Sequence, residues 1–182
     1  MLDQLINNLK EQESASDNYT GLFREISVAP KTILIKEGEI SKNIYFVKKG
    51  CLRLWFNNRG KDITFQFFFE NQAVSGLLGR EPSMFTLESI EPSTIVVLKR
   101  NDFNNLLNKI PELKDGFLEI VLQRIENYSR LFLSRIKDKP QKRYDELLKE
   151  NPQILRRVPQ HYIASYLGIT PVSLSRIRNR KK

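Results

Sequence analysis

PQHYIASYLGITPVSLSRIRNRKK, residues 159–182, predicts two short helices joined by a tight turn. Ile163, Ala164 and Leu167 mark one apolar face of the first helix. Gly168 follows where a helix commonly ends in a left-handed residue. Two short helices around a glycine-containing turn are typical of the helix-turn-helix, whose second helix enters the major groove of DNA.

The second helix has clear signals at its start. Thr170 is placed to accept a backbone hydrogen bond as the N-cap, and Pro171 stands at the first helical position, where its missing N–H removes no bond. Leu174 and Ile177 form an apolar stripe that can pack on the first helix. The remaining side chains are expected to face outward: Pro171, Val172, Ser175, Arg176 and Arg178.

Positive charge is concentrated at the C-terminal end of the chain. From residue 139 onward there are 11 Lys and Arg against 3 Asp and Glu, whereas the first 138 residues carry 19 basic and 18 acidic residues. This asymmetry favours a polyanionic partner, whose phosphates would supply the salt-dependent part of the affinity. The alternative is a helical hairpin with a solvated basic tail, and the confinement of charge to one end argues against it.

Composition excludes several classes of protein. The single cysteine, Cys51, rules out an internal disulfide framework and a four-cysteine iron–sulfur cluster, and it fits a reducing cytoplasm. The sequence has no apolar run of 18 residues, and its amphipathic N-terminus is unlike a signal peptide, so a soluble cytoplasmic protein is expected. Because His161 is the only histidine, we expect no metal site and no enzyme activity, with His161 at the surface or beside a phosphate.

Short β-type runs separated by turn signals fill the region between residues 32 and 98. We expect strands at 32–36, 43–48, 51–56, 62–69, 85–90 and 94–99. The turn signals are Glu37-Gly38-Glu39, Lys49-Gly50, Asn57-Asn58-Arg59-Gly60 and Glu91-Pro92. This spacing indicates an antiparallel barrel, roll or sandwich, preceded by an amphipathic helix.

The apolar period becomes helical from Asn101 onward. We expect a short helix around 102–108, a break at Pro111 and one long helix over about 113–138. Steps of four and three residues define a coiled-coil seam that contains Ser129 and the apolar Leu118, Leu122, Ile125, Phe132 and Ile136. A second stripe consists of Phe117, Val121, Tyr128 and Leu131. Two apolar faces need two partners, the barrel and the same helix of a second subunit, so a homodimer is expected. A monomer with one wide core-facing stripe is the alternative.

Pro140 is expected to end the long helix, because proline cannot continue a helix and disfavours helical geometry in the residue before it. This hinge divides the chain into domains 1–138 and 139–182, the second with three or four short helices, one of them over 142–150. The expected fold class is α+β. It combines an antiparallel, jelly-roll-like β-roll with flanking helices, a long dimerisation helix and an all-α helix-turn-helix domain.

Two segments resemble the Crp/Fnr family of bacterial transcription regulators. LIKEGEISKNIYFVKKG, residues 34–50, looks like the family's cyclic-nucleotide-domain signature, with Ser41 where Gly, Ala or Cys is usual. IASYLGITPVSLSRIR, residues 163–178, looks like its DNA-reading motif. The resemblance covers nearly the whole chain and implies a homodimer that binds a double-stranded DNA operator. RNA polymerase is a further candidate partner, through Trp55 and Phe67 to Phe69, although core packing is the commoner fate of such residues.

The resemblance also places a candidate effector pocket in AVSGLLGREPSMF, residues 73–85. Ser75-Gly76 and Pro82-Ser83 stand where relatives that bind cyclic AMP have a Gly-Glu pair and an Arg-Ser or Arg-Thr pair. The ribose acceptor and the bidentate phosphate contact are therefore lost, and control by cyclic AMP is not expected. Two further readings are an unknown, less polar effector and a roll kept for its shape, and no cofactor is expected. The candidate pocket residues are Val74, Ser75, Gly76, Leu77, Arg80, Ser83 and Met84, with Arg80 the one candidate to bind an anion.

The DNA-reading segment departs from the family at the first two recognition positions, where many members have Arg-Glu and this chain has Pro171-Val172. Arg176 matches a later base-contacting arginine and is expected to contact guanine. The expected DNA-binding residues are Thr170, Val172, Ser173, Ser175, Arg176, Arg178 and Arg180, the last two through phosphates. Because the sequence ends at Lys182, no wing is expected. The alternative function is a small-molecule sensor whose C-terminal helices contact a protein.

Overall fold

The computed structural model describes residue 9 and residues 19–75 and 81–179 of the chain. The chain forms two compact units, one made of residues 1–56 and 65–113 and the other of residues 57–64 and 114–182. The opening amphipathic helix predicted from the sequence lies outside the described residues, apart from the helical and buried Leu9. No described helix combines the length and apolarity needed to cross a bilayer.

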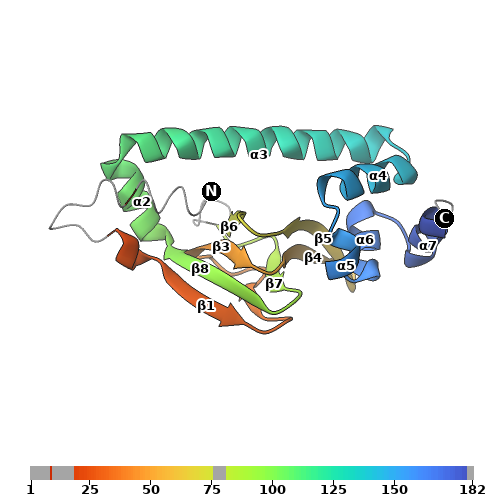
Figure 1. The fold of residues 1–182 in the computed structure, drawn as a ribbon, viewed down its shortest axis with the longest axis horizontal. Helices are drawn as coiled ribbons and strands as arrows, with labels where there is room; N and C mark the ends of the chain where they lie inside the picture. The colour runs from red at the N-terminus through yellow and green to blue at the C-terminus, as the bar shows by residue number, and fades with distance from the viewer. Residues whose placement is uncertain (1–8, 10–18, 76–80, 180–182) are drawn as a thin grey trace. The chain divides into compact units, whose positions relative to one another are not determined.

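Two four-stranded antiparallel sheets form the β-roll (Figure 1). The first has the order β1-β8-β3-β6, with β1 Arg24–Val28, β8 Ser93–Lys99, β3 Asn43–Lys49 and β6 Ala73–Ser75. The second has the order β2-β7-β4-β5, with β2 Ile33–Ile35, β7 Thr86–Ser89, β4 Leu52–Asn58 and β5 Lys61–Phe68. The predicted antiparallel roll is confirmed, and the six predicted strands are found to within two residues. β1 and β6 were not predicted, and they are short strands at the two edges of one sheet.

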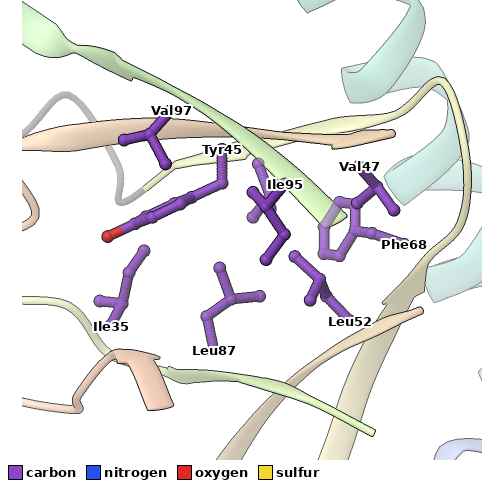
Figure 2. Packing of buried hydrophobic residues seen from close by; sticks show 9 residues of the cluster. Ile35, Tyr45, Val47, Leu52, Phe68, Leu87, Ile95 and Val97 are labelled. Atoms are coloured by element: carbon purple, nitrogen blue, oxygen red, sulfur yellow. The ribbon is translucent and has the colours of Figure 1, made fainter. Parts of the chain in front are cut away.

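The core of the roll lies between the two sheets. Figure 2 shows Ile95 from the first sheet pointing toward Leu52 and Leu87 from the second. The ring of Tyr45, also from the first sheet, extends toward Ile35 of the second. The hydroxyl of Tyr45 donates to the carbonyl of Leu34 at 2.8 Å, which satisfies the one polar group of this ring. This packing explains why the side chains at the inward-facing positions of these strands are apolar.

A second apolar layer covers the opposite face of β3 and β8. Ile44, Phe46, Val96 and Leu98 pack there against Leu9 and against Phe103 and Leu106 of α2, the helix Arg100–Lys109. Because both faces of β3 and β8 are buried, their sequences IYFV and IVVL are continuously apolar. Phe67, Phe68 and Phe69 are also buried. They therefore belong to the core and are not exposed for a contact with polymerase.

The helices after the roll follow the predicted order. They are α3 Pro111–Lys137, α4 Pro140–Glu150, α5 Ile154–Arg157, α6 Gln160–Leu167 and α7 Pro171–Asn179. The predicted break at Pro111 is wrong by one residue, because Ile110 is extended and Pro111 is the first residue of α3, a position that proline tolerates. Lys139 is extended with ψ 150°, as a residue before proline should be.

Among the described residues, four short helices begin at or after Pro140. The buried apolar residues of this segment are Tyr144, Leu147, Ile154, Val158, Ile163, Ala164, Leu167 and Leu174. Most of α3 belongs to the same compact unit as these helices. The predicted domain boundary after residue 138 instead marks the break in the helix, and it stays a prediction.

Candidate DNA-binding surface

The turn between α6 and α7 has the predicted geometry. Gly168 is left-handed, with φ 66° and ψ 34°, and its N–H donates to the carbonyl of Ser165 at 3.0 Å. The N–H of Ile169 donates to the carbonyl of Ala164, also at 3.0 Å, which completes the hydrogen bonds of a Schellman C-cap. The turn that separates the two helices is therefore built by local backbone chemistry.

Thr170 caps the start of α7 as predicted. Its Oγ1 accepts a hydrogen bond from the N–H of Ser173 at 3.1 Å and lies 3.0 Å from the Ser173 hydroxyl. Leu174 is buried and Ile177 is half-buried, so the predicted apolar stripe faces inward. Because Thr170 and Ser173 bond to each other, their predicted contacts with DNA would have to use the lone pairs that remain.

The opposite side of α7 is open to solvent. Val172 is 60% exposed, and Ser175, Arg176 and Asn179 are exposed as well. Residues three and four apart share one face of a helix, so these four side chains form one surface. Arg178 is half-buried, contrary to its predicted outward position, because it lies beside this face rather than on it. Arg180 lies outside the described residues.

Two arginines from other helices hold the C-terminal end of α6. Arg143 of α4 donates to the carbonyl of Leu167 at 2.9 Å and to the carbonyl of Asp138 at 2.7 Å. Arg135 of α3 donates to the carbonyl of Tyr166 at 2.8 Å, and its guanidinium carbon lies 5.8 Å from the centre of the Tyr166 ring. Cations at a helix C-terminus are favoured by the helix dipole. Arg143 thus contributes to the fold as well as to the positive charge of this end of the chain.

Burial and neighbouring charge shift several pKa values in this unit. Burial raises the pKa of Tyr166 above its usual value, partly offset by the positive charge of Arg135. At the break between α3 and α4, a hydrogen bond from Lys142 lowers the pKa of Asp138, and the same 2.8 Å bond raises the pKa of Lys142. All three groups keep their usual charge states near neutral pH, so these shifts do not change the net charge of the unit there.

His161 is exposed on α6, and its ring centre lies 4.1 Å from that of Tyr162. In the part of the chain that the structure describes, no group of three or more His, Cys, Asp or Glu side chains could hold a metal ion.

The predicted dimer seam is exposed along α3. Leu118, Leu122, Ile125, Phe132 and Ile136 are 56% to 69% exposed. In the second stripe, Val121, Tyr128 and Leu131 are half-buried, and burial raises the pKa of Tyr128. Phe117 of this second stripe is 37% exposed. The dimer seam and the alternative of a monomer with one wide stripe both stay predictions.

The predicted effector residues do not share one environment. Val74 is part of the apolar core of the roll, whereas Met84 is 59% exposed. Ser83 joins two loops, because its N–H donates to the carbonyl of Glu39 at 2.9 Å and its carbonyl accepts from the N–H of Gly38 at 2.8 Å. Ser75 is half-buried, and Gly76, Leu77 and Arg80 lie outside the described residues. The pocket stays a prediction.

A buried ion pair within the roll was missed from the sequence. Arg53 Nη1 lies 2.9 Å from Glu88 Oε1, the Arg53 side chain is 1% exposed, and its guanidinium carbon lies 5.2 Å from the Trp55 ring centre. Arg53 and Glu88 are direct partners across β4 and β7. A charged residue inside the apolar run CLRLWF is the signal that points to such a pair.

Comparison with known proteins agrees with this architecture. Residues 25–110 match the cyclic nucleotide-binding domain family. FixK2 from Bradyrhizobium japonicum is 17% identical, with a TM-score of 0.76 over 87% of this chain and 83% of that chain. A mutant of CooA from Carboxydothermus hydrogenoformans is 16% identical, with a TM-score of 0.72 over 93% and 80%.

A cyclic nucleotide-binding domain containing protein from Listeria monocytogenes EGD-e is 18% identical, with a TM-score of 0.71 over 98% and 89% of the two chains. No curated protein matches the chain in sequence. At these identities the solved structures show a shared fold, and the resemblance stated from the two sequence segments is confirmed at that level.

Proposed function

We propose that this chain, which has the fold of the Crp/Fnr regulators and a cyclic nucleotide-binding-type domain at residues 25–110, is a homodimeric, sequence-specific DNA-binding transcription regulator. The observation that carries the proposal is the outer face of α7, where Val172, Ser175 and Arg176 are exposed side by side. Binding to an operator implies that the protein works in the cytoplasm, with RNA polymerase as a candidate partner.

The side chains on this face suit the edges of bases in the major groove. An arginine can donate two hydrogen bonds to O6 and N7 of guanine, and an apolar side chain can contact the methyl group of thymine. Arg176 would take the first role and Val172 the second, with Ser175 donating to a phosphate or a base edge. Arg178 and Arg180 would contact phosphates, which fix position without specifying sequence.

The exposed seam of α3 supports the homodimer. Large apolar side chains along several turns of a helix at coiled-coil spacing are costly to leave in water. A second copy of the same helix would cover them. Two recognition helices related by a two-fold axis then meet successive major grooves, about 34 Å apart, and so require an operator with two related half-sites.

Cyclic AMP is not proposed as the effector, because Ser75-Gly76 and Pro82-Ser83 lack the carboxylate and guanidinium that grip it in relatives. The cyclic nucleotide-binding-type fold is kept without those groups. If a small molecule controls the protein, it is of another chemical kind. The chain's own residues give no reason to propose an enzyme activity.

A salt titration of DNA binding tests the proposed function. Fluorescence anisotropy with a labelled duplex, measured from about 50 to 200 mM salt, should show that the binding affinity falls steeply. The logarithm of the association constant should fall with the logarithm of the salt concentration, with a slope of about −0.9 for each phosphate neutralised. Binding that is absent, or that ignores salt, would contradict the proposal. It would favour the alternative, a small-molecule sensor whose C-terminal helices contact a protein.

A further inference from the structure

β4 and β5 are joined by a tight turn. The dihedral angles of this turn define which residues of the two strands pair with each other. Arg59 and Gly60 both have positive φ, 53° and 82°, which defines a two-residue turn of type I′. The N–H of Gly60 donates to Oδ1 of Asn57 at 3.0 Å. Asn58 and Lys61 then form the closing hydrogen-bonded pair.

Hydrogen-bonded and non-hydrogen-bonded pairs alternate along an antiparallel hairpin. Counting from Lys61, Ile63 directs its backbone N–H and C=O toward β4, whereas Asp62 and Thr64 direct theirs away from it. β5 is the last strand of its sheet, so these outward groups lie on an edge with no further strand among the described residues.

Ser165 of α6 satisfies two of these edge groups with a single hydroxyl. The Thr64 N–H donates to Ser165 Oγ at 2.9 Å, and the same hydroxyl donates to the carbonyl of Asp62 at 3.0 Å. An adjacent strand would use an N–H and a C=O for this purpose, whereas here one side chain supplies both the acceptor and the donor. Thr64 is fully buried, and residues 57–64 and α6 belong to the same compact unit.

Ser165 occupies the turn of α6 that leads directly into the recognition helix. The next two residues are Tyr166 and Leu167, whose carbonyls accept hydrogen bonds from Arg135 and Arg143. Three consecutive residues of α6 are therefore held by β5, α3 and α4, immediately before Gly168. The exposed face of α7 takes no part in these contacts, so docking on β5 leaves it free to contact DNA.

We infer that Ser165 is a positioning residue, which docks the helix-turn-helix on the outer edge of β5 and so fixes the direction in which α7 faces the major groove. The inference rests on the proposed DNA-binding function. In a dimer, two recognition helices held in fixed positions can bind only half-sites with one spacing. Helices that are no longer held by β5 can also bind half-sites with other spacings. Ser165 thus sets the spacing of the operator, although no DNA contact is assigned to it.

Amide hydrogen exchange tests the docking without DNA. In the 182-residue chain, Ser165→Ala should raise the exchange rate of the Thr64 amide about tenfold or more, while the Ile63 amide, which points toward β4, should not change. Ser165→Thr keeps a hydroxyl and should restore protection. Equal protection of Thr64 in the wild type and in Ser165→Ala would overturn the inference, whatever the DNA results.

Binding to operators of different half-site spacing tests the positioning role. Ser165→Ala should weaken binding at the best spacing about five- to tenfold and change binding less at spacings one base pair longer or shorter. Asp62→Asn is the matched control, because Ser165 bonds to the backbone carbonyl of that residue, and it should keep the wild-type profile. An unchanged profile in Ser165→Ala would refute positioning. Absence of wild-type DNA binding would instead refute the proposed function, and the exchange result would then stand alone.

Discussion

Arg143 Nη2 donates to the carbonyl of Leu167 at 2.9 Å, and so joins α4 to the C-terminal end of the first helix of the helix-turn-helix. The same guanidinium donates to the carbonyl of Asp138 at 2.7 Å, at the end of α3. One planar side chain thus connects three helices, a task that suits the fork of donors in arginine better than the single ammonium of lysine.

Replacing Arg143 should therefore destabilise the helical unit. Arg143→Ala removes both hydrogen bonds and leaves two carbonyls without their donor, which should lower the free energy of unfolding by about 1–3 kcal/mol. Arg143→Lys keeps the charge but not the fork, and it should recover less than half of the loss. Denaturant unfolding followed by circular dichroism measures both variants, and equal stability of Arg143→Ala and the wild type would contradict this role.

Substitution of Gly168 should lower the free energy of unfolding because of the backbone conformation at this position. A Cβ atom at Gly168 would meet nothing within 4 Å, so the cost of Gly168→Ala comes from the left-handed φ of 66° alone. We expect a loss of about 1–2 kcal/mol of unfolding free energy. Gly168→Asn should cost less, because asparagine adopts this conformation more readily. Thermal unfolding of the two variants decides the order, and a more stable alanine variant would contradict the account.

The seam of α3 should hold the dimer together. Leu122→Asp combined with Ile125→Asp places four charges in the proposed interface and should give monomers by light scattering, together with loss of operator binding. Gln123→Asp changes an exposed residue of the same helix outside the seam and should leave the dimer intact. A dimer that persists in the double variant would rule out this seam.

Cyclic AMP should not bind in the micromolar range. Isothermal titration calorimetry of the purified protein should give no heat of binding beyond dilution, because the carboxylate and the guanidinium that hold the ligand in relatives are replaced here. A micromolar dissociation constant would show that other residues grip the phosphate, with Arg80 the first candidate for replacement.

Local signals made much of the fold predictable from the sequence. Gly168, Thr170 and Pro171 act on their own backbone neighbours, so the turn and both helices follow from the sequence alone. The strands were predictable because their runs are apolar on one or both faces. By contrast, β1 and β6 are short edge strands, and only their pairing with β8 and β3 defines them.

The contacts that position the candidate site join residues far apart in the sequence. Arg143 and Leu167 are 24 residues apart, and Ser165 and Thr64 are 101 apart. Neither pair has a characteristic spacing or motif, because the partners on one side are backbone groups that every residue possesses. Arg53 and Glu88 are 35 residues apart and pair only because β4 and β7 adopt one register.

Sequence readout by α7 can be measured by selecting bound sequences from a random pool of duplexes with the wild type, Arg176→Ala and Arg178→Ala. The wild type should enrich a two-fold symmetric sequence with half-sites about 10 base pairs apart and a guanine in each. Arg176→Ala should lose the preference at that guanine, worth about 1–3 kcal/mol, whereas Arg178→Ala should weaken binding to all sequences alike. A wild type that enriches no sequence, or an Arg176→Ala variant that keeps the guanine preference, would contradict the account.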